Sequence, residues 1–210
     1  KHADRLRSWT PDDAQTRGLG RLVEARRKAV NLRNRLAQQL GAELKGYYPQ
    51  ALEWTGSSLT TQMACAFLLR WPTLASVRRA RPEAVRKFYQ EHRCRNTERI
   101  EERLQEMRTA KSLTTDPAIV EPSVLTVQML ARQIQLLGSA IVRYEEEIEK
   151  HLATHPDTEL FRSLPGAGAA LTPRLLVALG TNRDRFESAA EVQQYAGIAP
   201  VTERSGKQTW

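Results

Sequence analysis

The chain has few cysteines, few aromatic residues and no long apolar run. Cys65 and Cys94 are its two cysteines among 210 residues, and they form neither a CxxC pair typical of zinc sites nor the framework of a disulfide-rich domain. No stretch approaches the roughly eighteen apolar residues of a membrane helix, and no signal-peptide pattern is present. These absences argue against a membrane protein or a small disulfide-stapled domain. They predict a cytoplasmic protein with reduced cysteines.

The alternation of apolar and polar residues that marks a half-buried strand is also nearly absent. Only the last segment, TERSGKQTW (residues 202–210), suggests half of a hairpin. The sequence therefore predicts an all-α fold. We expect a long-helix and coiled-coil unit over residues 1–156, followed by a small, incomplete helix-hairpin-helix domain over residues 157–210.

Positive charge is unevenly distributed along the chain. Lys and Arg total 32 against 24 Asp and Glu, a net charge of +8. Residues 1–45 hold 11 basic and 5 acidic groups and residues 78–111 hold 11 and 6, whereas residues 112–161 hold 3 and 8. The distribution favours a polyanionic partner, most often nucleic acid, for the basic parts. A solvated arginine-rich surface is the alternative.

A long amphipathic helix is expected near the amino terminus. Thr10, as the cap, and Pro11 form its start signal, and Gly46 and Pro49 mark its end. Apolar residues recur along it every seven positions, as in a coiled coil. Basic residues occupy its other faces. Those expected to contact nucleic acid are Arg26, Arg27, Lys28, Arg33 and Arg35.

Three shorter helices are expected: one over residues 59–70, one that starts at Pro82 and one that starts after a cap at Asn96. Pro117 and Pro122 should then break the chain. A second long helix, ended by His155 and Pro156, then carries apolar residues at alternating spacings of three and four, typical of a coiled coil. Its seam either pairs with the first long helix or joins a second copy of the chain as a homo-oligomer. The seam residues are Val127, Leu130, Ile134, Leu137, Ile141, Tyr144 and Ile148.

The segment LPGAGAALTPRLLVALG (residues 164–180) has the form of a helix-hairpin-helix. We expect Leu164 to anchor the hairpin in the core while Gly166 and Gly168 clear space around the backbone. Amides that open the next helix would then bind a phosphate without reading sequence. Arg174 adds a charge from the next turn. A turn that needs glycine only for its geometry is the alternative.

Two other patterns predict no site. His151 and His155 lie four positions apart but have no third ligand nearby, so an exposed helix end is expected there and no metal site. SGKQT lacks the upstream glycine of a phosphate-binding P-loop, because Val201 occupies that position.

Ser205 lies in a turn between Arg204 and Lys207. A serine hydroxyl attacks phosphorus only when it is oriented, loses its proton and faces cations that stabilise the developing charge. The two basic neighbours supply such cations, and no residue identifies itself as the base. On chemistry alone, an ordinary polar turn residue remains the alternative.

Taken together, two segments carry a family resemblance. Residues 161–210 combine the glycine hairpin, a small helix, the stretch YAGIAP and the Ser-Gly-Lys turn. They resemble the carboxy-terminal domain of the IS110/IS116 group of bacterial insertion-sequence transposases. The arginine-rich stretch over residues 21–52 is similar to the long helix that follows the catalytic amino-terminal domain in that group.

The resemblance implies a recombinase that exchanges DNA strands under the direction of a structured guide RNA, in the bacterial cytoplasm at the nucleoid. It implies a RuvC-like domain with four acidic residues and Mg²⁺ before Lys1, and a serine, here Ser205, that becomes joined to DNA. Arg204 and Lys207 would bind DNA beside it. Both ends of the chain look cut, so we expect this chain alone to be inactive. A non-catalytic DNA-binding and dimerisation scaffold, or a protein-binding coiled coil, are the competing functions.

Overall fold

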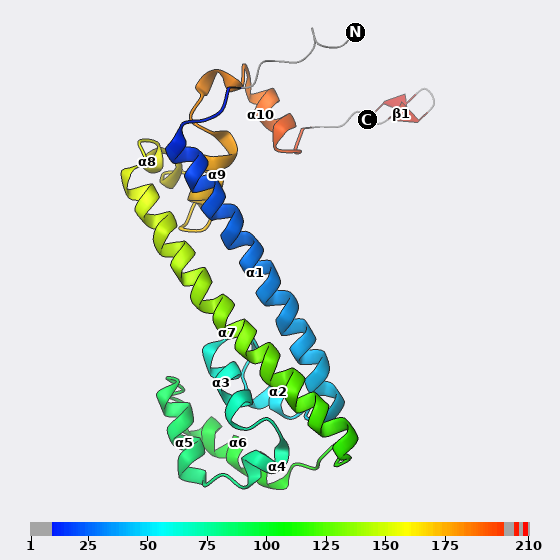
Figure 1. The fold of residues 1–210 in the computed structure, drawn as a ribbon. Helices are drawn as coiled ribbons and strands as arrows, with labels where there is room; N and C mark the ends of the chain where they lie inside the picture. Colours follow the sequence, from blue (N-terminus) through cyan, green and yellow to red (C-terminus); the bar gives the residue numbers. More distant parts are fainter. Residues whose placement is uncertain (1–9, 200–203, 206–207, 210) are drawn as a thin grey trace. The chain divides into compact units, whose positions relative to one another are not determined.

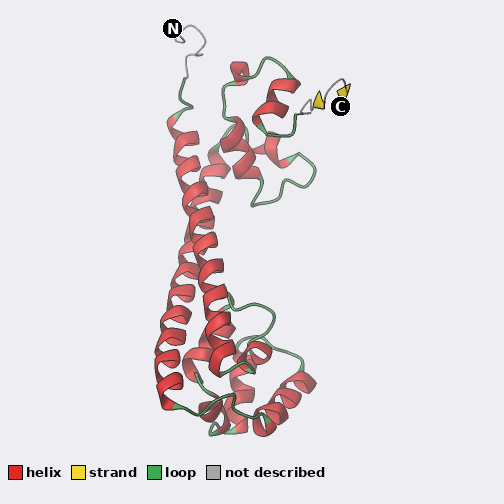
Figure 2. Cartoon of the chain, turned by 90° about the vertical axis from the view of Figure 1, so that its right-hand side faces the viewer, coloured by secondary structure: helices red, strands yellow, loops and turns green. Residues whose placement is uncertain are grey.

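The computed structural model describes residues 10–199, 204–205 and 208–209 (Figure 1). Helices dominate the described part (Figure 2), which confirms the predicted all-α fold. A single antiparallel pair of two-residue strands joins β1 (Arg204–Ser205) to β2 (Gln208–Thr209). This pair lies in the segment where half a hairpin was expected.

The chain divides into two compact units. One, called here the helical unit, spans Leu22–Glu147. The other, called here the carboxy-terminal unit, combines Lys1–Arg21 with Ile148–Trp210. The beginning of the chain thus packs with its last quarter, an association that the sequence-based boundary at residue 156 did not include.

The first long helix is present as α1 (Ala14–Tyr47), but its cap is Asp13 and not Thr10. Oδ1 of Asp13 accepts the backbone N–H groups of Gln15 at 2.8 Å and Thr16 at 3.0 Å. An aspartate directly before the helix reaches the second and third amides, which otherwise lack partners. The prediction for Thr10 was wrong because a better acceptor lies three residues closer to the helix.

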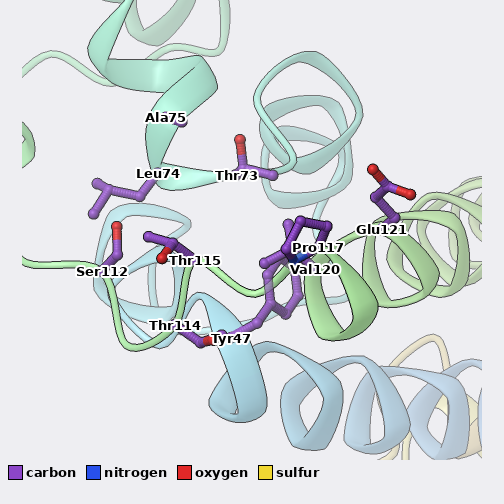
Figure 3. Close-up of a pocket in the computed structure, with 10 residues that line it drawn as sticks. All are labelled: Tyr47, Thr73, Leu74, Ala75, Ser112, Thr114, Thr115, Pro117, Val120 and Glu121. Carbon is purple, nitrogen blue, oxygen red and sulfur yellow. The ribbon is translucent and has the colours of Figure 1, made fainter.

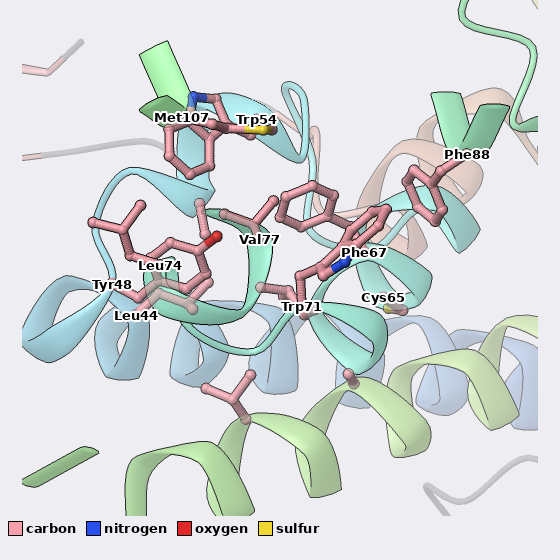
Figure 4. Packing of buried hydrophobic residues seen from close by; sticks show 14 of the residues in the cluster. Leu44, Tyr48, Trp54, Cys65, Phe67, Trp71, Leu74, Val77, Phe88 and Met107 are labelled. Atoms are coloured by element: carbon pink, nitrogen blue, oxygen red, sulfur yellow. The ribbon is translucent and has the colours of Figure 1, made fainter. Parts of the chain in front are cut away.

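Five shorter helices follow in the helical unit: α2 (Ala51–Trp54), α3 (Gln62–Arg70), α4 (Leu74–Arg78), α5 (Pro82–Glu91) and α6 (Thr97–Thr109). The predicted starts at Pro82 and Asn96 are confirmed, with Oδ1 of Asn96 accepting the N–H of Arg99 at 2.9 Å. These helices enclose an aromatic core (Figure 4). In it the ring centroid of Trp71 lies 5.3 Å from that of Phe67 and 5.1 Å from that of Phe88, both in edge-to-face arrangements.

The second long helix, α7 (Pro117–Thr154), begins at Pro117, so the predicted break there is confirmed. It runs through Pro122, where the predicted break was wrong. Pro117 is the first helical residue, where its missing N–H has no intrahelical partner to lose. The carboxylate of Asp116 accepts the N–H of Ala118 at 2.9 Å and caps this end. Pro122 removes one further backbone bond near the start, which the rest of a 38-residue helix tolerates.

The apolar seam of α7 is mostly buried. Val127, Leu130 and Ile134 join the core of the helical unit together with Leu40 and Leu44 of α1. α1 and α7 lie side by side in this unit in both views (Figures 1 and 2). The hairpin alternative for the seam is therefore present in the helical unit. Pairing with a second copy remains a prediction.

The carboxy-terminal unit contains α8 (Thr158–Arg162), α9 (Thr172–Leu179), a short 3₁₀ helix (Arg183–Arg185) and α10 (Ala189–Tyr195). α8 and α9 pack on each other. Leu164 does not anchor them, because 41% of its surface is exposed, whereas Phe161 on α8 is 3% exposed. Phe161 is therefore the residue that anchors this part in the core, because the side chain of Leu164 in the turn is exposed to solvent.

Candidate nucleic-acid interface

The turn between α8 and α9 is built around Gly166. This residue has a φ of +79°, which L side chains rarely adopt, and a Cβ placed there would meet no atom within 4 Å. The amide of Ala167 donates to the carbonyl of Leu164 at 3.0 Å, and the amide of Gly168 donates to that of Gly166 at 2.9 Å. Gly166 thus offers open backbone, whereas the Gly168 amide is used inside the turn.

The start of α9 is only partly available to an anion. The N–H groups of Leu171 and Thr172 both donate to the carbonyl of Gly168 at 3.0 Å, and Pro173 has no N–H. The buried hydroxyl of Thr172 donates to the carbonyl of Ala167 at 3.0 Å. Arg174 is exposed, so its side chain is the group of this helix start that presents positive charge.

Three of the five basic residues predicted on α1 face carboxylates within the helical unit. Arg26 contacts Glu145 of α7, with Nε at 3.0 Å. Arg27 binds both carboxylate oxygens of Glu24 at 2.8 Å, and Lys28 approaches the same group at 3.7 Å. The hydrogen bond from Arg27 lowers the pKa of Glu24, which keeps this pair charged.

The other two basic residues predicted on α1, Arg33 and Arg35, form no such pairs with carboxylates in the described part of the chain. Arg35 is exposed, and within the described residues it forms no ion pair. Arg33 is half-buried, and its Nε is buried without a hydrogen-bond partner in the same part of the chain. The positive charge that α1 offers to a partner is therefore concentrated on fewer residues than its sequence indicated.

Ser205 is the last residue of β1, directly before the turn of the small hairpin. The register pairs Arg204 with Thr209 and Ser205 with Gln208, so residues 206 and 207 connect the strands. Two-residue connections are typical of tight hairpins and favour glycine. Gly206 and the predicted DNA-binding Lys207 lie outside the described residues.

Sequence reasoning missed a buried polar network around His155. This residue is 5% exposed, so the predicted exposed helix end was wrong. Its Nδ1 accepts the N–H of Asp157 at 3.2 Å, which leaves Nε2 as the protonated nitrogen, 3.0 Å from the hydroxyl oxygen of Thr16. That hydroxyl donates to Oδ2 of Asp13 at 2.7 Å. The Thr16 hydrogen bond is the main cause that lowers the pKa of Asp13 from 3.8 to about 2.

Asp12 makes a second connection within the carboxy-terminal unit. Its Oδ1 accepts the N–H of Thr181 at 3.1 Å, just after α9. Gly180 has a φ of +70°, and a Cβ there would lie 2.5 Å from the same oxygen. No local pattern indicates these contacts, because the partners are 169 positions apart.

A pocket of about 270 Å³ in the helical unit contains none of the predicted site residues (Figure 3). Hydroxyl groups and apolar side chains line it together with one carboxylate, that of Glu121. It has no basic lining residue and so offers no phosphate site. In the described part of the chain, no three metal-binding side chains come together. No helix there is long and apolar enough to span a bilayer.

The comparisons with known proteins point to one class. Residues 158–210 match the model of the Transposase IS116/IS110/IS902 family. This segment contains the Gly166 turn, α9, α10 and the Ser205 hairpin. The resemblance to the IS110/IS116 group of insertion-sequence transposases is thereby confirmed.

Particular relatives extend the similarity over most of the chain. The mini-circle protein of Streptomyces coelicolor assigned as the transposase for IS117 is 32% identical over 192 residues, which cover 89% of this chain and 46% of the relative. An uncharacterized 43.6 kDa protein of insertion element IS110 from the same species is 27% identical over 97% of this chain and 50% of its own length. An uncharacterized 42 kDa protein of IS900 from Mycobacterium paratuberculosis is 27% identical over 75% of this chain and 39% of its own.

The chain spans half or less of the length of these curated relatives. No solved structure matches it significantly.

Proposed function

We propose that this chain is part of a transposase that moves an insertion sequence by DNA strand exchange, and that its carboxy-terminal unit handles the DNA. The observation that carries the proposal is the match of residues 158–210 to a transposase family. Within this match lie an open glycine backbone at Gly166, the exposed Arg174 and the hairpin that ends β1 at Ser205.

Ser205 is the proposed nucleophile. Its Oγ gives up a proton to a base and forms a bond to a DNA phosphorus, while the bond from that phosphorus to one ester oxygen breaks. The departing strand leaves with a free hydroxyl, and the other strand stays joined to Ser205. Arg204 and Lys207 stabilise the charge that develops on the phosphate oxygens. The place of Ser205 in the sequence, between Arg204 and Lys207, supports this role.

The remaining predicted residues position nucleic acid. Gly166 lets a phosphate approach the backbone, and Arg174 supplies charge from the first turn of α9. Gly168 shapes the turn, since its amide already donates to Gly166. On α1, Arg35 offers an exposed charge to DNA or to a structured guide RNA, and the partnered Arg26, Arg27 and Lys28 contribute less.

The proposal also includes a metal-binding domain, the assembly of several copies and a location in the cell. A RuvC-like domain with an acidic cluster would hold Mg²⁺, as the family resemblance implies. The described residues of this chain bring no three suitable donors together and do not fit that ion. The homo-oligomer remains a prediction, but most seam residues of α7 are buried within this chain, so copies of the protein would associate through other residues. The enzyme would work at the nucleoid in the bacterial cytoplasm.

The test is replacement of Ser205 in the complete protein. Ser205→Ala should abolish the covalent protein–DNA adduct that denaturing gels detect, while DNA binding in a mobility-shift experiment stays the same. Ser163→Ala is the matched control, because Ser163 lies in the same segment and only donates to the carbonyl of Leu160 at 2.8 Å. Adduct formation by the Ser205→Ala protein would refute the nucleophile assignment.

A non-catalytic scaffold is the second candidate. The pairing of α1 with α7 in the helical unit and the ion pairs that neutralise part of the basic helix favour it. A scaffold would bind DNA through the carboxy-terminal unit and never form an adduct, with or without Ser205. A coiled coil that binds only protein would bind no nucleic acid at any salt concentration.

A further inference from the structure

Arg185, Phe186 and Tyr195 form a compact cluster in the carboxy-terminal unit. The guanidinium carbon of Arg185 lies 4.8 Å from the ring centroid of Tyr195 and 5.4 Å from that of Phe186. The two rings are 5.3 Å apart, with their planes inclined at 56°. The cluster joins the end of the 3₁₀ helix (Arg183–Arg185) to the end of α10.

The exposure of this cluster sets it apart from similar ones in the chain. Arg70 over Trp71 and Arg103 over Tyr89 cover rings that are 5% and 0% exposed, as expected for side chains that complete a core. Tyr195 is 51% exposed, and α10 has no buried residue. Packing alone therefore does not account for this ring.

The cluster is held in place by local hydrogen bonds. Nη1 of Arg185 donates to the carbonyl of Ala178 at the end of α9, at 3.5 Å. Ser188 caps α10 by accepting the N–H of Glu191, and the carboxylate of Glu191 accepts the N–H of Glu187 at 2.8 Å. A fixed exposed ring loses little conformational freedom when a flat group stacks on it, which favours binding.

We infer that the exposed ring of Tyr195, backed by Arg185 and Phe186, is a stacking platform for an unpaired nucleobase. Aromatic faces and guanidinium planes stack on the bases of single strands without selecting a sequence. The exposed group of the cluster is a ring face, so the recognised group is the base and not the backbone. This inference rests on the proposed function, because strand exchange exposes bases that have lost their partners.

The unpaired base can belong to a DNA strand or to a guide RNA, since both present the same ring face. The probes are therefore two hairpin duplexes of identical sequence, one DNA and one RNA, each with a single bulged 2-aminopurine. A perfectly paired duplex of the same length is the reference. Stacking on an aromatic ring quenches 2-aminopurine fluorescence, which reports the contact itself.

Tyr195→Ala should weaken binding to a bulged probe by roughly 5- to 150-fold, as expected for the loss of one base–aromatic stack, and should abolish the quenching. Binding to the paired duplex should not change. Tyr195→Phe keeps the ring and should retain both properties. Ile198→Ala, at a neighbouring exposed apolar residue, should behave as the unaltered chain.

Each other outcome overturns the inference. If the chain binds the paired duplex but Tyr195→Ala leaves bulge binding and quenching unchanged, the platform is absent and the proposed function stands. If the variant loses binding to the bulged and the paired probes equally, its effect is structural, and its circular-dichroism spectrum should differ from that of the unaltered chain. If the unaltered chain binds no nucleic acid, the platform and the proposed function fail together.

Discussion

The hydroxyl oxygen of Thr16 lies 3.0 Å from Nε2 of His155, although the two residues are 139 positions apart. The contact is buried, and it ties the start of α1 to the end of α7 inside the carboxy-terminal unit. Asp13 and Asp157 extend it on either side. The unit that contains the family match, residues 158–210, thus uses the first turn of α1 as part of its own structure.

Removing the Thr16 hydroxyl should destabilise this unit. Thr16→Val keeps the side-chain volume but leaves the buried Nε2 of His155 unpaired, which costs about 1–3 kcal/mol in the free energy of unfolding. Urea denaturation followed by circular dichroism measures the change. Thr109→Val is the control, because that exposed hydroxyl donates to the carbonyl of Gln105 at the surface of α6. Equal effects of the two substitutions would show that the buried network contributes nothing specific.

The depressed pKa of Asp13, about 2 against 3.8, predicts an acid-dependent stability. A carboxylate whose pKa is lower in the folded state contributes stability above its unfolded pKa and loses it as the pH falls toward the folded value. The midpoint of urea denaturation should therefore fall between about pH 4 and pH 2 more steeply in the unaltered chain than in Asp13→Asn. Parallel profiles in the two proteins would mean that Asp13 is not the group responsible.

Gly180 should not tolerate a side chain. Gly180→Ala would place a methyl group 2.5 Å from Oδ1 of Asp12 in a backbone conformation with φ of +70°, so thermal denaturation should show a clear loss of stability. Gly138→Ala is the matched control inside α7, where a Cβ meets no atom within 4 Å. There alanine should stabilise the helix by up to about 1 kcal/mol. A neutral Gly180→Ala would contradict the contact between Asp12 and the end of α9.

The sequence predicted most helices because their signals are local. The start at Pro82 and the Asn96 cap depend on neighbours a few positions away. Thr10 was predicted to cap the first long helix, but Asp13 lies closer to the helix and caps it. Pro122 was predicted to break the chain, but the long helix α7 continues through it. In both cases two local signals compete, and the sequence alone does not show which of them is stronger.

The site was predicted less completely than the fold. Gly166, Arg174 and Ser205 could be named from motifs, but the pairing of Arg26 with Glu145 depends on two helices that meet far apart in sequence. The same is true of Thr16 with His155. The cluster of Arg185, Phe186 and Tyr195 has only a weak sequence signal, an arginine next to one aromatic residue and ten positions before another. Patterns that indicate phosphate binding do not include it.

The exposed Arg35 should matter more for nucleic-acid binding than the paired Arg27. Arg27→Ala removes a charge that Glu24 already balances, whereas Arg35→Ala removes one that is open to a partner. If Arg35 contacts a phosphate, its loss should make the salt dependence of duplex binding shallower by about 0.9 in slope. Fluorescence anisotropy with labelled duplex DNA measures both variants. A larger effect of Arg27→Ala would contradict the assignment of Arg35 as the contact of α1 with nucleic acid.

The central claim, that this chain engages nucleic acid through several phosphates, is tested most directly by titration across a range of salt concentrations. Duplex DNA, branched DNA and structured RNA are the three ligands. Each phosphate neutralised on a duplex contributes about −0.9 to the slope of log affinity against log salt, and we predict a slope of roughly −4 or steeper. A preference for the branched or RNA ligand would indicate the strand-exchange or guide-bound state. Absence of binding to all three ligands at low salt would contradict the account.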